Sequence, residues 1–137
     1  MRARAVRGTA IRRLLCYGLV AAWLVVIWQF GQSRVLPLRS GDLLTWLVRK
    51  GLHLVIYGVF GGLLALTAGS RRRWGWIIAV CFLVALGDEL HQWTVPRRTF
   101  RIGDVGIDFV GGLLGAFVER LVSAPKTGRS SGPETAS

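Results

Sequence analysis

The chain has 137 residues, of which 52% are hydrophobic, and it carries a formal net charge of +11 at pH 7. A basic soluble protein that binds nucleic acid spreads Lys and Arg over one face of a helix or along a loop. Here long apolar runs carry almost no charge and the Arg residues gather between them, which argues against a nucleic-acid partner and is typical of a small polytopic membrane protein.

The first apolar segment covers residues 14–30 and contains no acidic or basic side chain. Its length is close to the roughly 20 residues that a helix needs to cross a bilayer. The preceding residues, 1–13, are basic, as in a secretory signal, but Trp28, Gln29 and Phe30 stand where a cleavage site requires small residues. We therefore expect an uncleaved membrane anchor behind a basic N-terminus.

Three further apolar segments follow. Residues 51–69 and 74–93 are joined by a short Ser-Arg-Arg-Arg loop and predict a helical hairpin, and residues 102–122 form a Gly-rich fourth segment. The remaining residues, 123–137, are too poor in apolar side chains to order themselves, so we expect a disordered tail. The sequence thus predicts an all-α integral membrane protein whose domain, residues 14–122, is a small bundle of four transmembrane helices.

Glycines recur at a spacing of four in two of these segments. Gly58 and Gly62 lie in the second segment, and Gly111 and Gly115 lie in the fourth. Small residues at this spacing allow two membrane helices to approach closely. They do not by themselves indicate dimerisation, and the oligomeric state stays open.

The orientation follows from the distribution of basic residues. With the N-terminus inside, eleven of the eighteen Lys and Arg residues fall in the N-terminal segment, the hairpin loop and the C-terminal end of the chain. Cytoplasmic segments carry the excess of Lys and Arg in membrane proteins. We therefore expect a multi-pass protein of the cell membrane, with both termini in the cytoplasm.

The stretch GDELHQWTVPRRTFRIGDVGID contains four of the seven acidic residues and would then lie at the outer membrane face. A carboxylate at the bilayer centre costs roughly 2.5 to 3.5 kcal/mol on insertion scales, so such residues usually face the bundle interior and mark function. Spacings of three or four residues place Asp88 and Glu89 near Gln92, and Asp104 near Asp108, on their helices. Each group should therefore project to one side.

The second segment offers partners for these carboxylates. Lys50, His53 and Tyr57 share one helix face, and we expect His53 or Tyr57 to lie within direct or one-water reach of Glu89 or Asp104. The loop arginines supply further cations. The polar residues of three helices should thus converge at one membrane level. We call this set the polar cluster: Lys50, His53, Tyr57, Asp88, Glu89, Gln92, Arg98, Asp104 and Asp108.

At these residues the chain resembles the VanZ-like membrane proteins, a family named for a teicoplanin-resistance protein. The resemblance is carried by KGLHLVIYG, DELHQ, PRRTF and DVGIDFVGGLLG, in the order of the family and with its approximate spacing. It covers the second to fourth apolar segments. Two positions depart from the family pattern: Arg97 stands where relatives often have Gly, and Asp108 where they usually have Asn.

The resemblance implies a role in the bacterial cell envelope. We expect the polar cluster to bind a lipid-linked or peptidoglycan precursor at the outer face and to lower susceptibility to glycopeptide antibiotics of the teicoplanin type. Membrane lipids are the other expected partners. The sequence identifies neither the ligand nor whether this member confers resistance.

Two alternatives stay open. A membrane-embedded hydrolase or transferase acting on a lipid phosphate could use Glu89 as general base and His53 as proton relay, with Arg98 or Lys50 holding the phosphate. A structural or accessory subunit would use the same residues only to lock the bundle. The sequence therefore leaves enzymatic activity undecided.

A metal site is conceivable from His53, Glu89, Asp104 and Asp108. The His-Glu-x-x-His spacing of zinc proteases is absent, as are a Walker loop and a dinucleotide fingerprint. We therefore expect neither a metal nor a cofactor.

Overall fold

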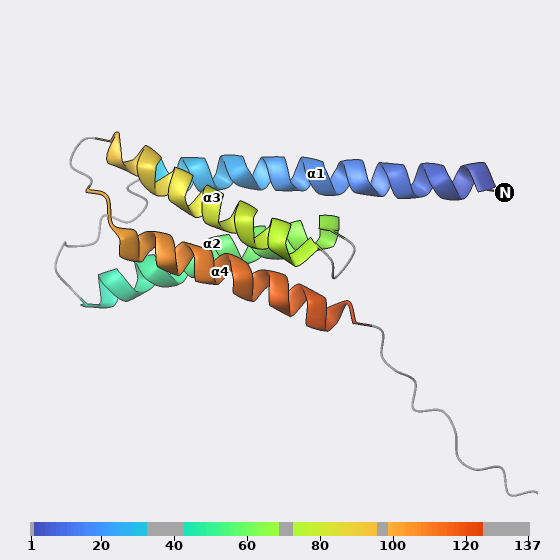
Figure 1. The fold of residues 1–137 in the computed structure, drawn as a ribbon. Coiled ribbons are helices and arrows are strands. Elements are labelled where there is room, and N and C mark those ends of the chain that lie inside the picture. The colour runs from blue at the N-terminus through green and yellow to red at the C-terminus, as the bar shows by residue number, and fades with distance from the viewer. Residues whose placement is uncertain (1, 33–42, 69–72, 96–98, 125–137) are drawn as a thin grey trace, which may run out of the picture.

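The computed structural model describes residues 2–32, 43–68, 73–95 and 99–124 (Figure 1). These residues form four helices: α1 (Arg2–Gln32), α2 (Leu43–Ala68), α3 (Trp74–Trp93) and α4 (Ile102–Val122). Successive helices run in opposite directions, so α2 and α4 are parallel and the N-terminus lies at the same end of the bundle as the end of α4 (Figure 1). The prediction of an all-α chain with four helices is confirmed.

Three segments of the described chain are long and apolar enough to cross a membrane: Leu14–Gly31, Leu43–Ala68 and Trp74–Trp93. These spans make the chain a multi-pass membrane protein in a lipid environment. The fourth helix is less apolar because it carries four charged residues, Asp104, Asp108, Glu119 and Arg120. That α4 also crosses the membrane therefore stays a prediction.

Two helices are longer than the apolar segments suggested. Helix α1 begins at Arg2 and not at residue 14, so at 1.5 Å per residue it is about 46 Å long and exceeds a hydrocarbon core of about 30 Å. Helix α2 begins at Leu43 and not at residue 51. Lys50 lies within this helix, as its expected place on one face with His53 and Tyr57 requires, and it is paired with Asp104.

The helices α2 and α4 pack with their backbones in direct contact. A Cβ atom at Gly61 would lie 1.8 Å from the carbonyl oxygen of Gly112, and one at Gly115 would lie 1.7 Å from that of Gly58. Only a hydrogen atom fits at these positions, and close approach through small residues drives helix association in membranes. We call this contact the glycine seam: Gly58, Gly61, Gly62, Gly111, Gly112 and Gly115.

The buried core continues from the glycine seam to α3. Phe60 of α2, Ile77 and Cys81 of α3 and Ala116 of α4 have no exposed surface. The Sγ atom of Cys81 lies 3.0 Å from where a Cβ of Gly112 would stand, so the small residues also let α3 approach the pair. These three helices form the compact part of the bundle.

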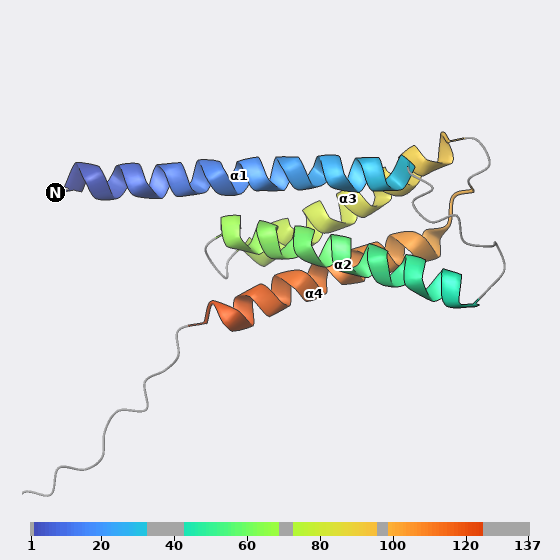
Figure 2. The ribbon, with the colours of Figure 1, turned by 180° about the vertical axis from the view of Figure 1, so that it is seen from behind.

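Helix α1 lies against this part along its second half only (Figure 2). The indole Nε1 of Trp23 donates a hydrogen bond of 2.9 Å to the backbone carbonyl of Ile56, and Ile27 and Gly31 are buried. Nearer the N-terminus, Leu14 and Leu15 are 70% and 63% exposed, as expected for side chains that face lipid.

Candidate functional site

Two polar pairs connect α2 with α4. The Lys50 ammonium donates a hydrogen bond to Oδ1 of Asp104 and forms an ion pair with it. Three residues further along α2, Nδ1 of His53 lies 3.0 Å from Oδ1 of Asp108. The pairs follow one another in the same order on both helices because α2 and α4 are parallel. Asp104 lies in the first turn of α4, where the helix dipole favours negative charge, and Asp108 lies one turn further on.

A third polar group connects α2 with α3. The hydroxyl of Tyr57 and Nε2 of Gln92 both donate to Oδ2 of Asp88, at 3.0 and 2.8 Å. All three side chains are buried. The other carboxylate oxygen, Oδ1, has no hydrogen-bond partner within the described parts of the chain. It faces Gly31 of α1, where a Cβ atom would stand only 2.7 Å away.

The carboxylate of Glu89 serves a different contact. It is 3% exposed and accepts a hydrogen bond of 2.6 Å from the backbone N–H of Arg101, the residue before α4. This contact ties the end of α3 to the beginning of α4, where a negative charge is again favoured by the helix dipole. Glu89 and His53, the candidates for general base and proton relay, thus hydrogen-bond to different partners.

The electrostatic balance of the polar cluster is strongly acidic in the described residues. Four carboxylates are present there, and Lys50 is the one side chain of the cluster with a permanent positive charge. Asp108 is 1% exposed, and its Oδ2 atom has no hydrogen-bond partner in the described chain. Asp88 and Asp108 therefore each present one buried carboxylate oxygen that is still able to accept a hydrogen bond.

The structure brings together all predicted members of the polar cluster that it describes. Arg98 lies outside the described residues. The expected partners differ in detail: His53 contacts Asp108 and Tyr57 contacts Asp88, where Glu89 or Asp104 was expected. The partners differ from those expected because Asp104 already pairs with Lys50, about one helical turn before His53 on α2 and Asp108 on α4.

Helix α1 makes contributions that the sequence did not indicate. Gly31 leaves room for Asp88, and the ring of Phe30 meets that of His53 edge-on at 6.0 Å. His91 turns away from the cluster and stacks on Trp28, with 3.6 Å between the ring centroids. The only sequence feature that marked the role of Gly31 was its position directly after a run of bulky residues. Glycines are common in membrane helices whatever their role, so this feature did not reveal the contact with Asp88.

The polar cluster presents two buried carboxylate oxygens that can accept hydrogen bonds. In the four described ranges, no group of three or more His, Cys, Asp or Glu side chains has a geometry that could hold a metal ion. Buried acceptors without partners are uncommon in folded proteins. Hydrogen-bond donors of a ligand would satisfy the two free oxygens.

The family of the chain follows from comparison with known proteins. No curated protein and no solved structure matches the chain. Residues 9–123, which include most of α1 and all of α2, α3 and α4, match the family model described as VanZ/LLP1, and the chain therefore belongs to the VanZ/LLP1 family.

Proposed function

We propose that the polar cluster is an outer-face site that binds the polar head of a lipid-linked or peptidoglycan precursor. Through this site the protein lowers susceptibility to teicoplanin-type antibiotics. The observation that supports the proposal best is the pair of buried carboxylate oxygens without partners, Oδ1 of Asp88 and Oδ2 of Asp108. Leaving such an acceptor unsatisfied costs about 1 to 3 kcal/mol, and the hydroxyl and amide donors of a glycopeptide precursor would remove that cost.

The proposal includes a topology. We propose that α4 crosses the membrane beside α2, because its 21 residues span about 31 Å and the glycine seam holds the two helices in contact. Asp104 and Asp108 are paired with Lys50 and His53, which lowers the cost of their insertion. Four crossings place both termini on one side, and the excess of basic residues favours the cytoplasm.

Cysteine labelling tests the topology. In a background without Cys16 and Cys81, a cysteine at Thr99 should react with a membrane-impermeant reagent applied outside, and one at Ser70 should not. The opposite labelling pattern would show that the orientation is inverted and that the polar cluster lies on the cytoplasmic side.

Substitution of a matched pair of acids tests the site. Asp88→Asn removes the charge beside the unpartnered oxygen, and Glu119→Gln removes the charge of an acid near the end of α4, which accepts a hydrogen bond from Ser123. With purified protein in nanodiscs, we expect Asp88→Asn to weaken binding of a lipid-linked precursor roughly tenfold, the value of one hydrogen bond to a charged group. Glu119→Gln should bind as wild type.

The same variants are then expressed in cells and compared both for membrane abundance and for protection against teicoplanin. Protection should fall for Asp88→Asn and persist for Glu119→Gln. If protection and membrane abundance fall together, the polar cluster has only a packing role. Unchanged precursor binding and unchanged protection in Asp88→Asn would show that the polar cluster does not bind the precursor.

A further inference from the structure

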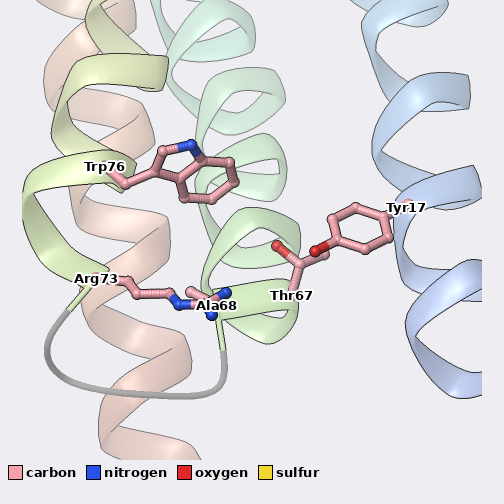
Figure 3. Close-up of a pocket in the computed structure, with 5 residues that line it drawn as sticks. All are labelled: Tyr17, Thr67, Ala68, Arg73 and Trp76. Carbon is pink, nitrogen blue, oxygen red and sulfur yellow. The ribbon is translucent and has the colours of Figure 1, made fainter. Parts of the chain in front are cut away.

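A pocket lies at the end of the bundle opposite the polar cluster. It has a volume of about 360 Å³ and is formed by Tyr17 of α1, Thr67 and Ala68 at the end of α2, and Arg73 and Trp76 at the beginning of α3. Figure 3 shows the Tyr17 hydroxyl pointing towards Thr67 and the Arg73 side chain extending towards Ala68. Nothing in the proposed precursor site uses these residues.

The pocket exists because α1 does not pack closely here. The helix is held through Trp23 and Ile27, further along the chain, while Tyr17 is 50% exposed and Leu14 is 70% exposed. The space between α1 and the α2–α3 hairpin is thus bordered by apolar side chains that face lipid. Within a bilayer, an apolar space of this kind is filled by the hydrocarbon chain of a lipid.

The polar lining favours an anion. Arg73 is exposed and forms no ion pair with any described residue, and its guanidinium can hold two oxygens of a phosphate at once. The Tyr17 hydroxyl supplies a second donor. The Thr67 hydroxyl already donates to the carbonyl of Leu64, at 2.7 Å, so it remains an acceptor. No acidic residue lines the pocket in the described chain.

The position along the membrane normal agrees with this chemistry. Arg73 directly precedes α3 and Trp76 lies in its first turn, so both stand at the end of a candidate span. Trp and Arg side chains are typical of this position, at the level of the lipid headgroups. By sequence, Arg71 and Arg72 precede the site, and Arg12 and Arg13 lie about one turn before Tyr17. Basic residues gathered between membrane helices at this level attract anionic lipids.

We propose that this pocket binds the phosphate headgroup of an anionic membrane lipid. Arg73 holds the phosphate, the Tyr17 hydroxyl adds a hydrogen bond, and an acyl chain runs between α1 and the α2–α3 hairpin. The lipid would thereby fill the gap that α1 leaves at this end. The proposal does not depend on the precursor site or on which side of the membrane this end faces.

Native mass spectrometry of the full chain tests the proposal, with phosphatidylglycerol or phosphatidylcholine added to the detergent-solubilised protein. We expect phosphatidylglycerol to bind more tightly, and Arg73→Gln to weaken its binding about tenfold, equivalent to about 1.4 kcal/mol. Arg73→Lys keeps the charge but loses the planar fork that holds two oxygens, so its affinity should lie between those of wild type and Arg73→Gln. Arg49→Gln, which removes another exposed arginine far from the pocket, should bind as wild type.

Three outcomes would overturn the proposal: equal binding of the two lipids, unchanged phosphatidylglycerol binding in Arg73→Gln, or an equal loss in Arg49→Gln. Displacement of the lipid by inorganic phosphate would assign the pocket to a soluble phosphate and overturn the lipid as its ligand. If Arg73→Gln is not recovered folded, Tyr17→Phe decides, since loss of one hydrogen bond to the charged phosphate should weaken phosphatidylglycerol binding roughly tenfold. Unchanged binding in Tyr17→Phe would then reject the site.

Discussion

The glycine seam and the packing of α1 represent two ways of associating helices in the same small bundle. In the glycine seam, the backbones of α2 and α4 touch, and a single added Cβ atom would overlap a carbonyl oxygen. In the described residues, helix α1 contacts the other helices through the Trp23 hydrogen bond, the rings of Trp28 and Phe30 and a few buried side chains, while much of its surface is exposed. The parallel pair α2–α4 is thus the rigid element, and α1 is a peripheral one.

The difference explains where the polar cluster is placed. The Lys50–Asp104 and His53–Asp108 pairs continue the glycine seam towards one end of the bundle, so the register of the seam fixes their distances. The proposed lipid pocket, in contrast, lies where α1 departs from the hairpin. A site that needs fixed polar geometry is built on the close contact, and a site that accommodates a flexible chain is built on the loose one.

The largest expected effect comes from adding one methyl group to the glycine seam. Gly115→Ala places a Cβ atom 1.7 Å from the backbone oxygen of Gly58, which cannot move without separating the helices. Overpacking costs about 1 to 3 kcal/mol in cores that can adjust, and more where they cannot, so we expect a loss of about 3 kcal/mol or more. Membrane abundance and the thermal midpoint in detergent measure it.

Gly75→Ala and Gly106→Ala are the matched controls, because a Cβ atom at either position has nothing within 4 Å. Both should be recovered at wild-type abundance, or slightly above it, since Ala is the better helix former. A stable Gly115→Ala protein would show that α2 and α4 are further apart than described and would weaken the contrast with α1.

The second effect is expected at Asp88. Asp88→Leu removes the acceptor that the buried Tyr57 hydroxyl and the Gln92 amide share, and leaving the Tyr57 hydroxyl unsatisfied costs about 1 to 3 kcal/mol. Combining it with Tyr57→Phe should restore part of the stability, because the pair of partners is then replaced by apolar groups. The four proteins of this cycle are compared by thermal midpoint; a fully additive loss would show that Tyr57 and Asp88 do not interact.

The sequence predicted the helices and the cluster membership better than the pairing. Apolar length alone indicates a helix, and spacing of three or four residues shows which side chains share a face, so Lys50, His53 and Tyr57 could be grouped. Which carboxylate each one meets depends on the register between α2 and α4. That register is fixed by the backbone contact of Gly61 with Gly112, which no periodicity within one helix reveals.

The beginning of α2 illustrates the same limit. The second apolar segment begins only after Arg49 and Lys50, so hydropathy alone indicated a span that starts near residue 51. The helix instead starts at Leu43, and Asp104 of α4 neutralises Lys50 within it. The sequence also did not reveal the role of Gly31, because the Asp88 oxygen that this glycine accommodates belongs to a different helix, α3.

A smaller effect is expected from the ion pair beside the glycine seam. Lys50 and Asp104 are partly exposed, with side-chain exposures of 13% and 25%, so water reduces the strength of their interaction. In a double-mutant cycle of Lys50→Met and Asp104→Asn, we expect a coupling of about 1 to 2 kcal/mol, below the value for a fully buried pair. Thermal midpoints at low and high salt measure it. A coupling energy near zero would show that water fully screens the Lys50–Asp104 ion pair.

The smallest expected effect concerns the attachment of α1. Trp23→Phe removes the hydrogen bond to the Ile56 carbonyl but keeps most of the apolar surface, so it should cost about 0.5 to 1.5 kcal/mol. Because the contact with α2 is local, hydrogen exchange should increase in the second half of α1 and remain unchanged in α2 and α4 near the glycine seam. Trp46→Phe, at a half-exposed position of α2, is the control and should change neither. An increase in exchange across all four helices would instead show that α1 and the glycine seam unfold as one unit, and the contrast between a rigid pair and a peripheral helix would no longer hold.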